Sequence, residues 1–391
     1  MKKSNLSFIG KIVLVIIAAV SIVFVAASSF ANVTFSNVTG GVKSFFHNMK
    51  KGEGFPYECS AQGPKKVGGI GSYLAMIDDS TVVFLNKTAK EVFRFDTTYT
   101  SPDMAISNGR ALVYNRGSSS FIVTGQSDLL YNADDTTGKL DGAVITGNIG
   151  KNGSLVFGTW TEEGTSKFVA LNKKLGTDFY YVFGSDRVMY VAVSDNGKYG
   201  ACAVFGVENA SYYSTVYVFD FDKEEPIQKI KLSGETVVRL DFLKNKSLSV
   251  ITDLKRREIS VKDKEEDNVV DYSAHSLVGV DFDLSSKKSV LCYSKYGSTS
   301  NVICAFYKNG NESCRIEDVE NVKAVSCDGN TIAVLTDSQV LCYGFRGNLK
   351  STIDLTFNVE SIKLESSGLY LFSGSNVYRT RIGRDFVLET E

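Results

Sequence analysis

The chain has 391 residues, and 43 lysines and arginines face 44 aspartates and glutamates, which gives a formal net charge of −1. This balance excludes the broad basic surface by which proteins bind nucleic acid. Tyrosine (19), phenylalanine (25) and glycine (34) are plentiful and proline is scarce (4), a composition typical of short strands joined by glycine turns.

Residues 1–31 predict a membrane-directed segment. Lys2, Lys3 and Lys11 precede an uncharged run over residues 12–31, which as a helix is about 30 Å long and can cross the hydrocarbon. Because the lysines come first, we expect residues 1–11 in the cytoplasm and the chain after Ala31 outside, as a single-pass protein of the cell membrane. The alternative is a signal peptide cleaved near Ala31 and a secreted protein. The length of the run favours the retained anchor.

Residues 32–54 are predicted to form a stalk. Val42, Phe45, Phe46 and Met49 have the spacing of one face of a short amphipathic helix. Such a helix can lie on the outer leaflet of the membrane or dock against the base of the domain that follows. The sequence leaves both placements open.

From Lys65 onward, a unit of short β-rich runs recurs, and Met189–Asp222 is its clearest copy. The turn between the first two strands of each copy recurs about every 42 residues, a period typical of β-propeller blades. These turns fall near Gly71, Gly109, Gly153, Gly197, Asn245, Ser286, Gly329 and Gly368. The spacing predicts an all-β fold, a single β-propeller over residues 55–391 with eight four-stranded blades, and a seven-bladed ring is the alternative.

The two ends of the repeat array are both incomplete. The last copy has only three strands before the chain stops, and one strand-like segment, Phe55–Ala61, precedes the first copy. We expect this segment to pair with the strands of residues 364–383, because that pairing closes the ring and leaves no open sheet edge. The closed ring is expected to be monomeric.

The repeats lack a recurring Trp-Asp or Gly-His pair, and Trp160 is the only tryptophan. The chain resembles instead the bacterial membrane-anchored β-propellers of domain of unknown function family 5711. The residues that carry the resemblance are the lysine-flanked anchor, the segment Gly52–Pro56, and the weak repeats that begin at Val67-Gly68-Gly69. The resemblance covers nearly the whole chain. It implies the fold and the anchor, and it brings no known activity or site residues.

Seven cysteines occur, with no Cys-x-x-Cys motif. Those inside strand patterns are expected to be free and buried, where cysteine acts as a small apolar residue. They are Cys202, Cys292, Cys304 and Cys342. Cys292 and Cys304 are predicted on neighbouring strands of one blade, so they are the pair best placed for a disulfide if one forms.

Residues for catalysis are few. Two histidines, His47 and His275, cannot assemble a convincing triad or metal site. The carboxylate pairs Asp220/Asp222 and Asp281/Asp283 are expected to close turns or accept hydrogen bonds from backbone amides. We therefore expect no catalytic, metal-binding or cofactor-binding residues.

Two functions from different classes remain. The favoured one is a non-catalytic scaffold that is anchored in the membrane and binds a protein or cell-envelope partner outside it. The alternative is an enzyme, or a receptor for a small ligand or carbohydrate, that uses the central channel. The scaffold hypothesis rests on long loops between strands, because loops on rigid scaffolds carry function. These are Thr161–Lys167, Glu208–Ser214, Lys255–Glu258 and Lys295–Asn301.

Four residues of these loops are the candidate partner-binding residues: Tyr212, Tyr213, Arg257 and Tyr296. Tyrosine and arginine are the residue types enriched at binding hot spots. In the fifth copy, we place the third strand at Ile259–Asp263, so that the charged run from Lys255 onward lies in solvent.

Overall fold

The computed structural model describes residues 51–60, 62–133, 140–184, 186–261 and 266–382. These residues form strands and turns, and no helix among them is long and apolar enough to cross a membrane. The predicted anchor at residues 12–31 and the predicted amphipathic helix at residues 42–49 lie outside the described residues.

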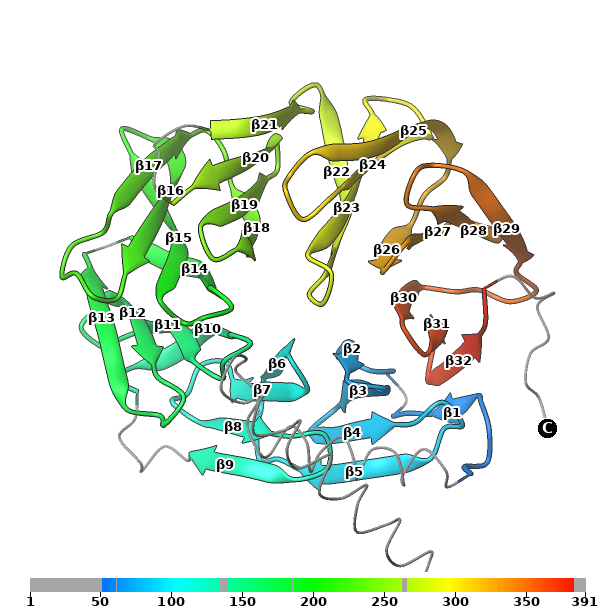
Figure 1. Cartoon of the computed structure of the whole chain (residues 1–391), viewed down its shortest axis with the longest axis horizontal. Coiled ribbons are helices and arrows are strands. Elements are labelled where there is room, and N and C mark those ends of the chain that lie inside the picture. Colours follow the sequence, from blue (N-terminus) through cyan, green and yellow to red (C-terminus); the bar gives the residue numbers. More distant parts are fainter. Residues whose placement is uncertain (1–50, 61, 134–139, 185, 262–265, 383–391) are drawn as a thin grey trace, which may run out of the picture.

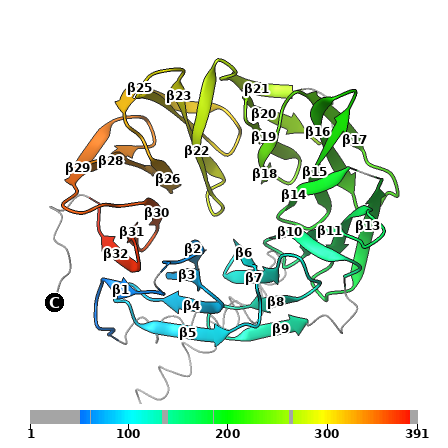
Figure 2. The same cartoon turned by 180° about the vertical axis from the view of Figure 1, so that it is seen from behind.

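Eight four-stranded antiparallel sheets stand around a common centre, and the innermost strand of each sheet is counted as its first (Figures 1 and 2). The prediction of eight blades is confirmed, and the seven-bladed alternative is wrong. Blades one to seven each use four consecutive strands, from β2–β5 to β26–β29. The eighth blade has the order β1-β32-β31-β30, so it combines both ends of the described chain.

The strand bounds of the first four blades are as follows: β2 (Lys66–Ile70), β3 (Tyr73–Asp78), β4 (Thr81–Leu85) and β5 (Glu91–Asp96); β6 (Pro102–Ser107), β7 (Arg110–Asn115), β8 (Phe121–Thr124) and β9 (Leu129–Ala133); β10 (Ala143–Ile149), β11 (Leu155–Trp160), β12 (Ser166–Leu171) and β13 (Thr177–Phe183); β14 (Arg187–Val193), β15 (Tyr199–Glu208), β16 (Ser211–Asp220) and β17 (Gln228–Ser233).

The last four blades have these bounds: β18 (Val237–Lys244), β19 (Ser247–Thr252), β20 (Lys255–Ser260) and β21 (Glu266–Asp271); β22 (His275–Asp283), β23 (Lys288–Lys295), β24 (Ser300–Phe306) and β25 (Glu312–Glu320); β26 (Ala324–Asp328), β27 (Thr331–Leu335), β28 (Gln339–Gly344) and β29 (Leu349–Asp354); β30 (Ser361–Glu365), β31 (Gly368–Ser373) and β32 (Asn376–Thr380), completed by β1 (Tyr57–Glu58).

Closure of the ring follows the predicted pairing. In the register of β1 with β32, Tyr57 lies opposite Val377 and Glu58 opposite Asn376. Phe55, only 3% exposed, packs edge-on against Tyr370 of β31 with ring centroids 5.8 Å apart. The expected pairing of the Phe55–Ala61 segment with the last blade is therefore confirmed through β1.

The two faces of the ring differ in which turns they carry. One face holds the turns between the first and second and between the third and fourth strands of each blade. The amide of Gly52 donates to the Thr88 hydroxyl (3.0 Å), and that of Gly54 to the Thr88 carbonyl (3.2 Å), in the β4–β5 turn. Both described ends of the chain lie here, so we call this side the terminal face. The opposite side, with the turns between second and third strands, is the hairpin face.

The core lies between neighbouring blades. The middle strands are buried on both sides, and β24 is buried along its whole length. Aromatic side chains join the blades, with Phe121 5.0 Å from Phe157 and Phe168 5.0 Å from Phe219 between ring centroids. Burial of one such ring stabilises the fold by about 2–3 kcal/mol, so the blades hold each other in place.

Two sequence expectations need correction or completion here. In blade five, the third strand is Lys255–Ser260 rather than Ile259–Asp263, so the residues placed in a solvated loop lie in β20. All seven cysteines are free, and all but Cys314 are buried. Cys292 lies opposite Ile303 and Cys304 opposite Leu291, so the two thiols point to opposite sides of the sheet and cannot bridge.

Candidate functional site

The hairpin of β15 and β16 in blade four projects beyond its sheet on the hairpin face. These two strands pair over their full length, from Tyr199 opposite Asp220 to Glu208 opposite Ser211. The flanking strands stop earlier, because β14 pairs only as far as Phe205 and β17 only as far as Tyr213. The tip of the hairpin therefore has no neighbouring strand on either side.

The tip turns through two residues with positive φ, Asn209 (φ 50°) and Ala210 (φ 59°). Two left-handed residues form the type I′ turn, whose twist matches that of a two-stranded ribbon. Asparagine adopts this conformation readily, whereas alanine is unusual in it. The two strands of the hairpin therefore stay paired as far as the turn.

One side of this hairpin tip is apolar and exposed. Val207 lies opposite Tyr212 in the register, and their side chains are 66% and 43% exposed. The ring of Phe205 stacks on Tyr212 with centroids 6.3 Å apart. We call Phe205, Val207 and Tyr212 the apolar tip.

The other side of the hairpin is polar and fixed. The Tyr213 hydroxyl donates to Asp186 (3.0 Å), and the Lys231 ammonium group lies 4.2 Å from the Tyr213 ring centroid and forms an ion pair with Glu208. Burial, and next the bond to Asp186, raises the pKa of Tyr213, so it stays a phenol. A Cβ on Gly206 would lie 2.5 Å from the Tyr213 ring. Only glycine at this position leaves room for the Tyr213 ring to lie across the strand.

The other two predicted binding residues lie elsewhere. Tyr296, 87% exposed, is in the β23–β24 turn of blade six, on the same face but two blades from the apolar tip. Arg257 is 4% exposed within β20, and its guanidinium donates to both oxygens of Glu235 at 2.8 Å. Arg257 joins β20 to the loop before β18, and a partner cannot reach it. Only Tyr212 and Tyr213 share one hairpin, and they lie on its opposite sides.

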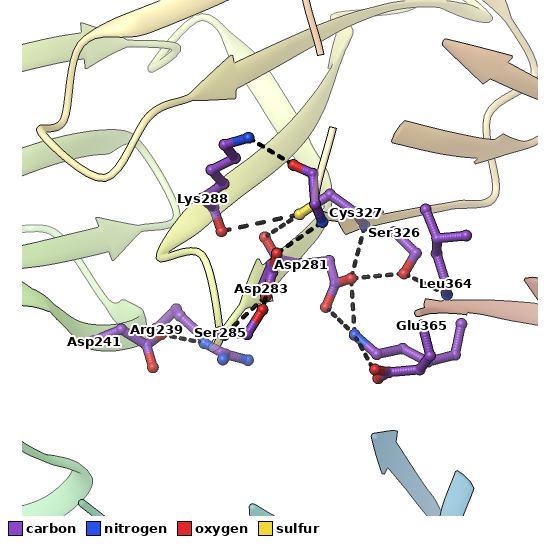
Figure 3. A network of polar contacts seen from close by, with 12 residues as sticks. Arg239, Asp241, Asp281, Asp283, Ser285, Lys288, Ser326, Cys327, Leu364 and Glu365 are labelled. Carbon is purple, nitrogen blue, oxygen red and sulfur yellow. Dashed lines mark hydrogen bonds and ion pairs between the residues drawn. The ribbon is translucent and has the colours of Figure 1, made fainter. Parts of the chain in front are cut away.

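The channel side of the ring holds a polar network that sequence reasoning missed (Figure 3). The Lys363 ammonium group of β30 donates to both oxygens of Asp281 on β22 (2.8 and 2.9 Å). Asp281 also accepts from the Ser326 hydroxyl (2.6 Å) and the Cys327 amide (2.9 Å) of β26. This network joins the inner strands of blades six, seven and eight.

Asp281 and Asp283 accept hydrogen bonds from backbone amides, as predicted. Asp283 binds the amides of Ser285 (2.8 Å), Ser286 (3.1 Å) and Gly329 (2.8 Å). A usable sequence signal was present, because charges two residues apart recur on the predicted first strands. They are Arg239/Asp241, Asp281/Asp283 and Lys363/Glu365.

Charges inside the channel shift each other's pKa. Burial alone would raise the pKa of Asp281, but the attraction of Lys363 and the hydrogen bonds it receives hold that pKa below its usual range. Burial raises the pKa of Asp328 to about 6 and that of Glu365 to about 7. Burial also raises the pKa of the Cys327 thiol, which therefore stays protonated. Among the described residues, no cluster suited to a metal ion occurs.

Glu365 supplies a pH-dependent prediction. Its pKa is raised from 4.5 to about 7, so the folded state binds more protons than the unfolded state between these values, and stability falls as pH rises through that window. At pH 8, Glu365→Gln should stabilise the protein by about 2–3 kcal/mol. Near pH 4, the substitution should have little effect. Thermal melting of both proteins from pH 4 to pH 8 measures the difference.

The control for this prediction is Glu360→Gln, which changes an exposed carboxylate five residues away. It should leave the pH profile of wild type unchanged. If the Glu365→Gln profile runs parallel to wild type over the same range, the channel does not hold this carboxyl as described. Gly69→Ala tests the close approach of Glu365 to β2. A Cβ on Gly69 would lie 2.0 Å from the Glu365 carboxylate, so the substitution should displace this side chain.

Two solved structures with TM-scores above 0.5 support the fold. The C-terminal WD40 domain of Sif2 covers 83% of this chain and 97% of its own, at 13% identity and a TM-score of 0.58. A eukaryotic initiation factor covers 84% and 88%, at 13% identity and a TM-score of 0.56. BamB from Moraxella catarrhalis covers 83% and 98%, at 12% identity and a TM-score of 0.48. At these identities the likeness concerns the fold alone.

No match is found among curated proteins. The family model described as a family of unknown function (DUF5711) matches residues 56–380, which is most of the chain and the whole ring. The protein therefore belongs to the DUF5711 family.

Proposed function

We propose that this protein is a membrane-anchored scaffold that binds a protein partner outside the membrane through the apolar tip of blade four. The observation that carries the proposal is the exposure of Val207 (66%) and Tyr212 (43%) on a hairpin that extends beyond its own sheet. Aromatic and aliphatic side chains held on a rigid, preorganised element are typical anchors of protein interfaces.

The path of the chain supports this orientation. Residues 51–54 lie on the terminal face, against the turn at Thr88. An anchor at residues 12–31 would therefore place the terminal face toward the membrane and the hairpin face away from it. The apolar tip would then point to the space where an extracytoplasmic partner is found.

The channel network supports a role other than catalysis. Asp281 is engaged by Lys363, Ser326 and the Cys327 amide, and the thiol of Cys327 stays protonated. A general base or nucleophile needs a free position next to the reacting atom. These side chains bind one another and brace neighbouring blades.

A single labelling experiment tests both the location and the docking surface. Ser211→Cys places a thiol at an exposed position of the hairpin tip and keeps Val207 and Tyr212, while the seven natural thiols are buried or half-buried. A membrane-impermeant maleimide that carries a photo-crosslinker is added to intact cells that express the full chain. We expect Ser211→Cys to be labelled and, after illumination, to form a discrete partner adduct. Adding Val207→Ser should reduce that adduct at least about tenfold, as loss of a buried hot spot does.

The matched control is Leu129→Cys, at a side chain 50% exposed on the outer strand β9 of blade two. It should be labelled and form no adduct. If neither variant is labelled, the location outside the membrane is contradicted. Equal adducts from both positions, or labelling without any adduct, would contradict the docking surface.

A further inference from the structure

A cleft of about 900 Å³ opens on the terminal face, where the turns of blades three to six surround the end of the channel. Its charged lining residues are five lysines and one aspartate: Lys151, Lys244, Lys287, Lys288, Lys308 and Asp195. The whole chain has a net charge of −1. The cleft is therefore a local departure from the charge balance of the protein.

The lysines come from turns that are far apart in sequence. Lys151 is in the β10–β11 turn, Lys244 ends β18, Lys288 begins β23, and Lys308 is in the β24–β25 turn. The first strands lie innermost, so the turns after them converge on the central axis (Figure 1). The fold therefore gathers the charges of these turns on one side of the channel, and Lys308 joins them from an outer turn of blade six.

The β22–β23 turn of blade six forms one wall of the cleft. It reaches toward the centre of the ring, as Figures 1 and 2 show, and Lys287 forms an ion pair with Asp195 of blade four at 2.8 Å. This contact passes over blade five. Lys287 has a φ of 59°, a left-handed conformation uncommon for residues other than glycine. The ion pair from blade six to blade four holds the wall in place.

Carboxylates neutralise only part of this charge. Asp195 pairs with Lys151 (3.1 Å) as well as with Lys287. Asp283, beneath the turn and 6% exposed, accepts from Ser285, Ser286 and Gly329. Lys288 donates to the Gly329 carbonyl (2.7 Å) and the Asn330 side chain (2.6 Å), which are uncharged.

Like Lys288, two further lysines of the cleft have no ion-pair partner in the part of the chain that the structure describes. Lys244 and Lys308 are both exposed, and both residues line the cleft. Their charges come from different blades, five and six. Like charges held around one cleft repel each other, and an anion bound between them would relieve this repulsion.

We propose that this cleft is a binding site for an anionic ligand that carries phosphate groups. Lysine ammonium groups pair with phosphate as compact point charges, and the side-chain amides of Asn245 and Asn309 in the lining can donate further hydrogen bonds. The volume exceeds that of one phosphate and falls in the usual range for sites of small ligands. The ligand is therefore either a soluble polyphosphate-like anion or the phosphate headgroup of a lipid.

The test measures binding to the full chain purified in a zwitterionic detergent. One arm titrates tripolyphosphate by calorimetry, and the other titrates dihexanoylphosphatidylglycerol, with dihexanoylphosphatidylcholine as the uncharged comparison. We expect saturable binding of at least one of the two anions. Lys244→Glu combined with Lys308→Glu should weaken it by at least about tenfold, the effect of losing charge-assisted bonds. Tripolyphosphate binding alone indicates a soluble ligand, and binding of the anionic lipid alone indicates a headgroup.

The control is Lys173→Glu combined with Lys174→Glu, two exposed lysines in the β12–β13 turn on the same face but outside the cleft. It makes the same change in net charge and should weaken binding less than about twofold, because salt screens distant surface charges. Equal loss of anion binding in both double variants would overturn the proposal, since the charge of the whole face, and not the cleft, would then attract the anion. Absence of binding by either anion would also overturn it. Neither result depends on the apolar tip, which lies on the opposite face.

Discussion

Replacing Phe55 by alanine is expected to lower the free energy of unfolding by about 3–5 kcal/mol, the usual cost of removing a buried phenyl ring. Phe55 is 3% exposed and packs on Tyr370, which has no exposed surface. It lies just before β1, whose pairing with β32 closes the ring. The lost ring therefore weakens the one seam that joins the two ends of the described chain. Denaturant unfolding of the full chain measures the effect.

Leu349→Ala is the matched control for this experiment, because Leu349 is a large apolar residue on an outer strand, β29, and is 54% exposed. Its effect should stay within about 0.5 kcal/mol. Deletion of residues 51–58 should destabilise the ring more than Phe55→Ala does, since it also exposes the edge of β32. If Phe55→Ala and Leu349→Ala unfold at the same denaturant concentration, the ring is not closed through this segment.

The number of blades and the closure could be predicted from the sequence because both depend on local signals. Each turn between first and second strands has its own glycine, asparagine or serine, and the runs around it are rich in β-branched and aromatic residues. The hairpin of blade four was predicted only in part, because residues 208–214, which were expected to form a long loop, lie mostly in β15 and β16. Its strand alternation and its turn lie in one continuous stretch, Tyr199–Asp220.

Blade five shows why local signals were not enough. Lys255, Arg256 and Arg257 suggested a solvated loop, yet Arg256 is fully buried, with its guanidinium 3.9 Å from the Phe306 ring centroid, and Arg257 pairs with Glu235. Phe306 belongs to blade six and Glu235 to the loop before β18. Partners this distant in sequence decide whether a charge is buried, and no period or composition reveals them. The lysine-rich cleft was missed for the same reason.

The second large effect is expected in the channel, where Lys363→Met should destabilise the ring by about 3–5 kcal/mol, the usual result of leaving one member of a buried ion pair without its partner. The two side chains of the pair are only 17% (Lys363) and 16% (Asp281) exposed. Methionine keeps most of the volume of lysine, so the loss arises from charge rather than from a cavity. The double variant with Asp281→Asn should recover at least about 1 kcal/mol relative to the sum of the two single changes.

The pH dependence separates this explanation from a packing defect. In wild type, the lowered pKa of Asp281 means that its stabilising contribution is present above its unfolded value and is lost as pH falls through its folded value. Without Lys363, burial is the dominant influence on Asp281 and raises its pKa. The deficit of Lys363→Met should therefore shrink as pH is lowered from 8 to 5, because the carboxylate then becomes neutral. A deficit of equal size at both pH values would show that the lysine stem supports the blades, and that the ion pair across β22 and β30 contributes nothing.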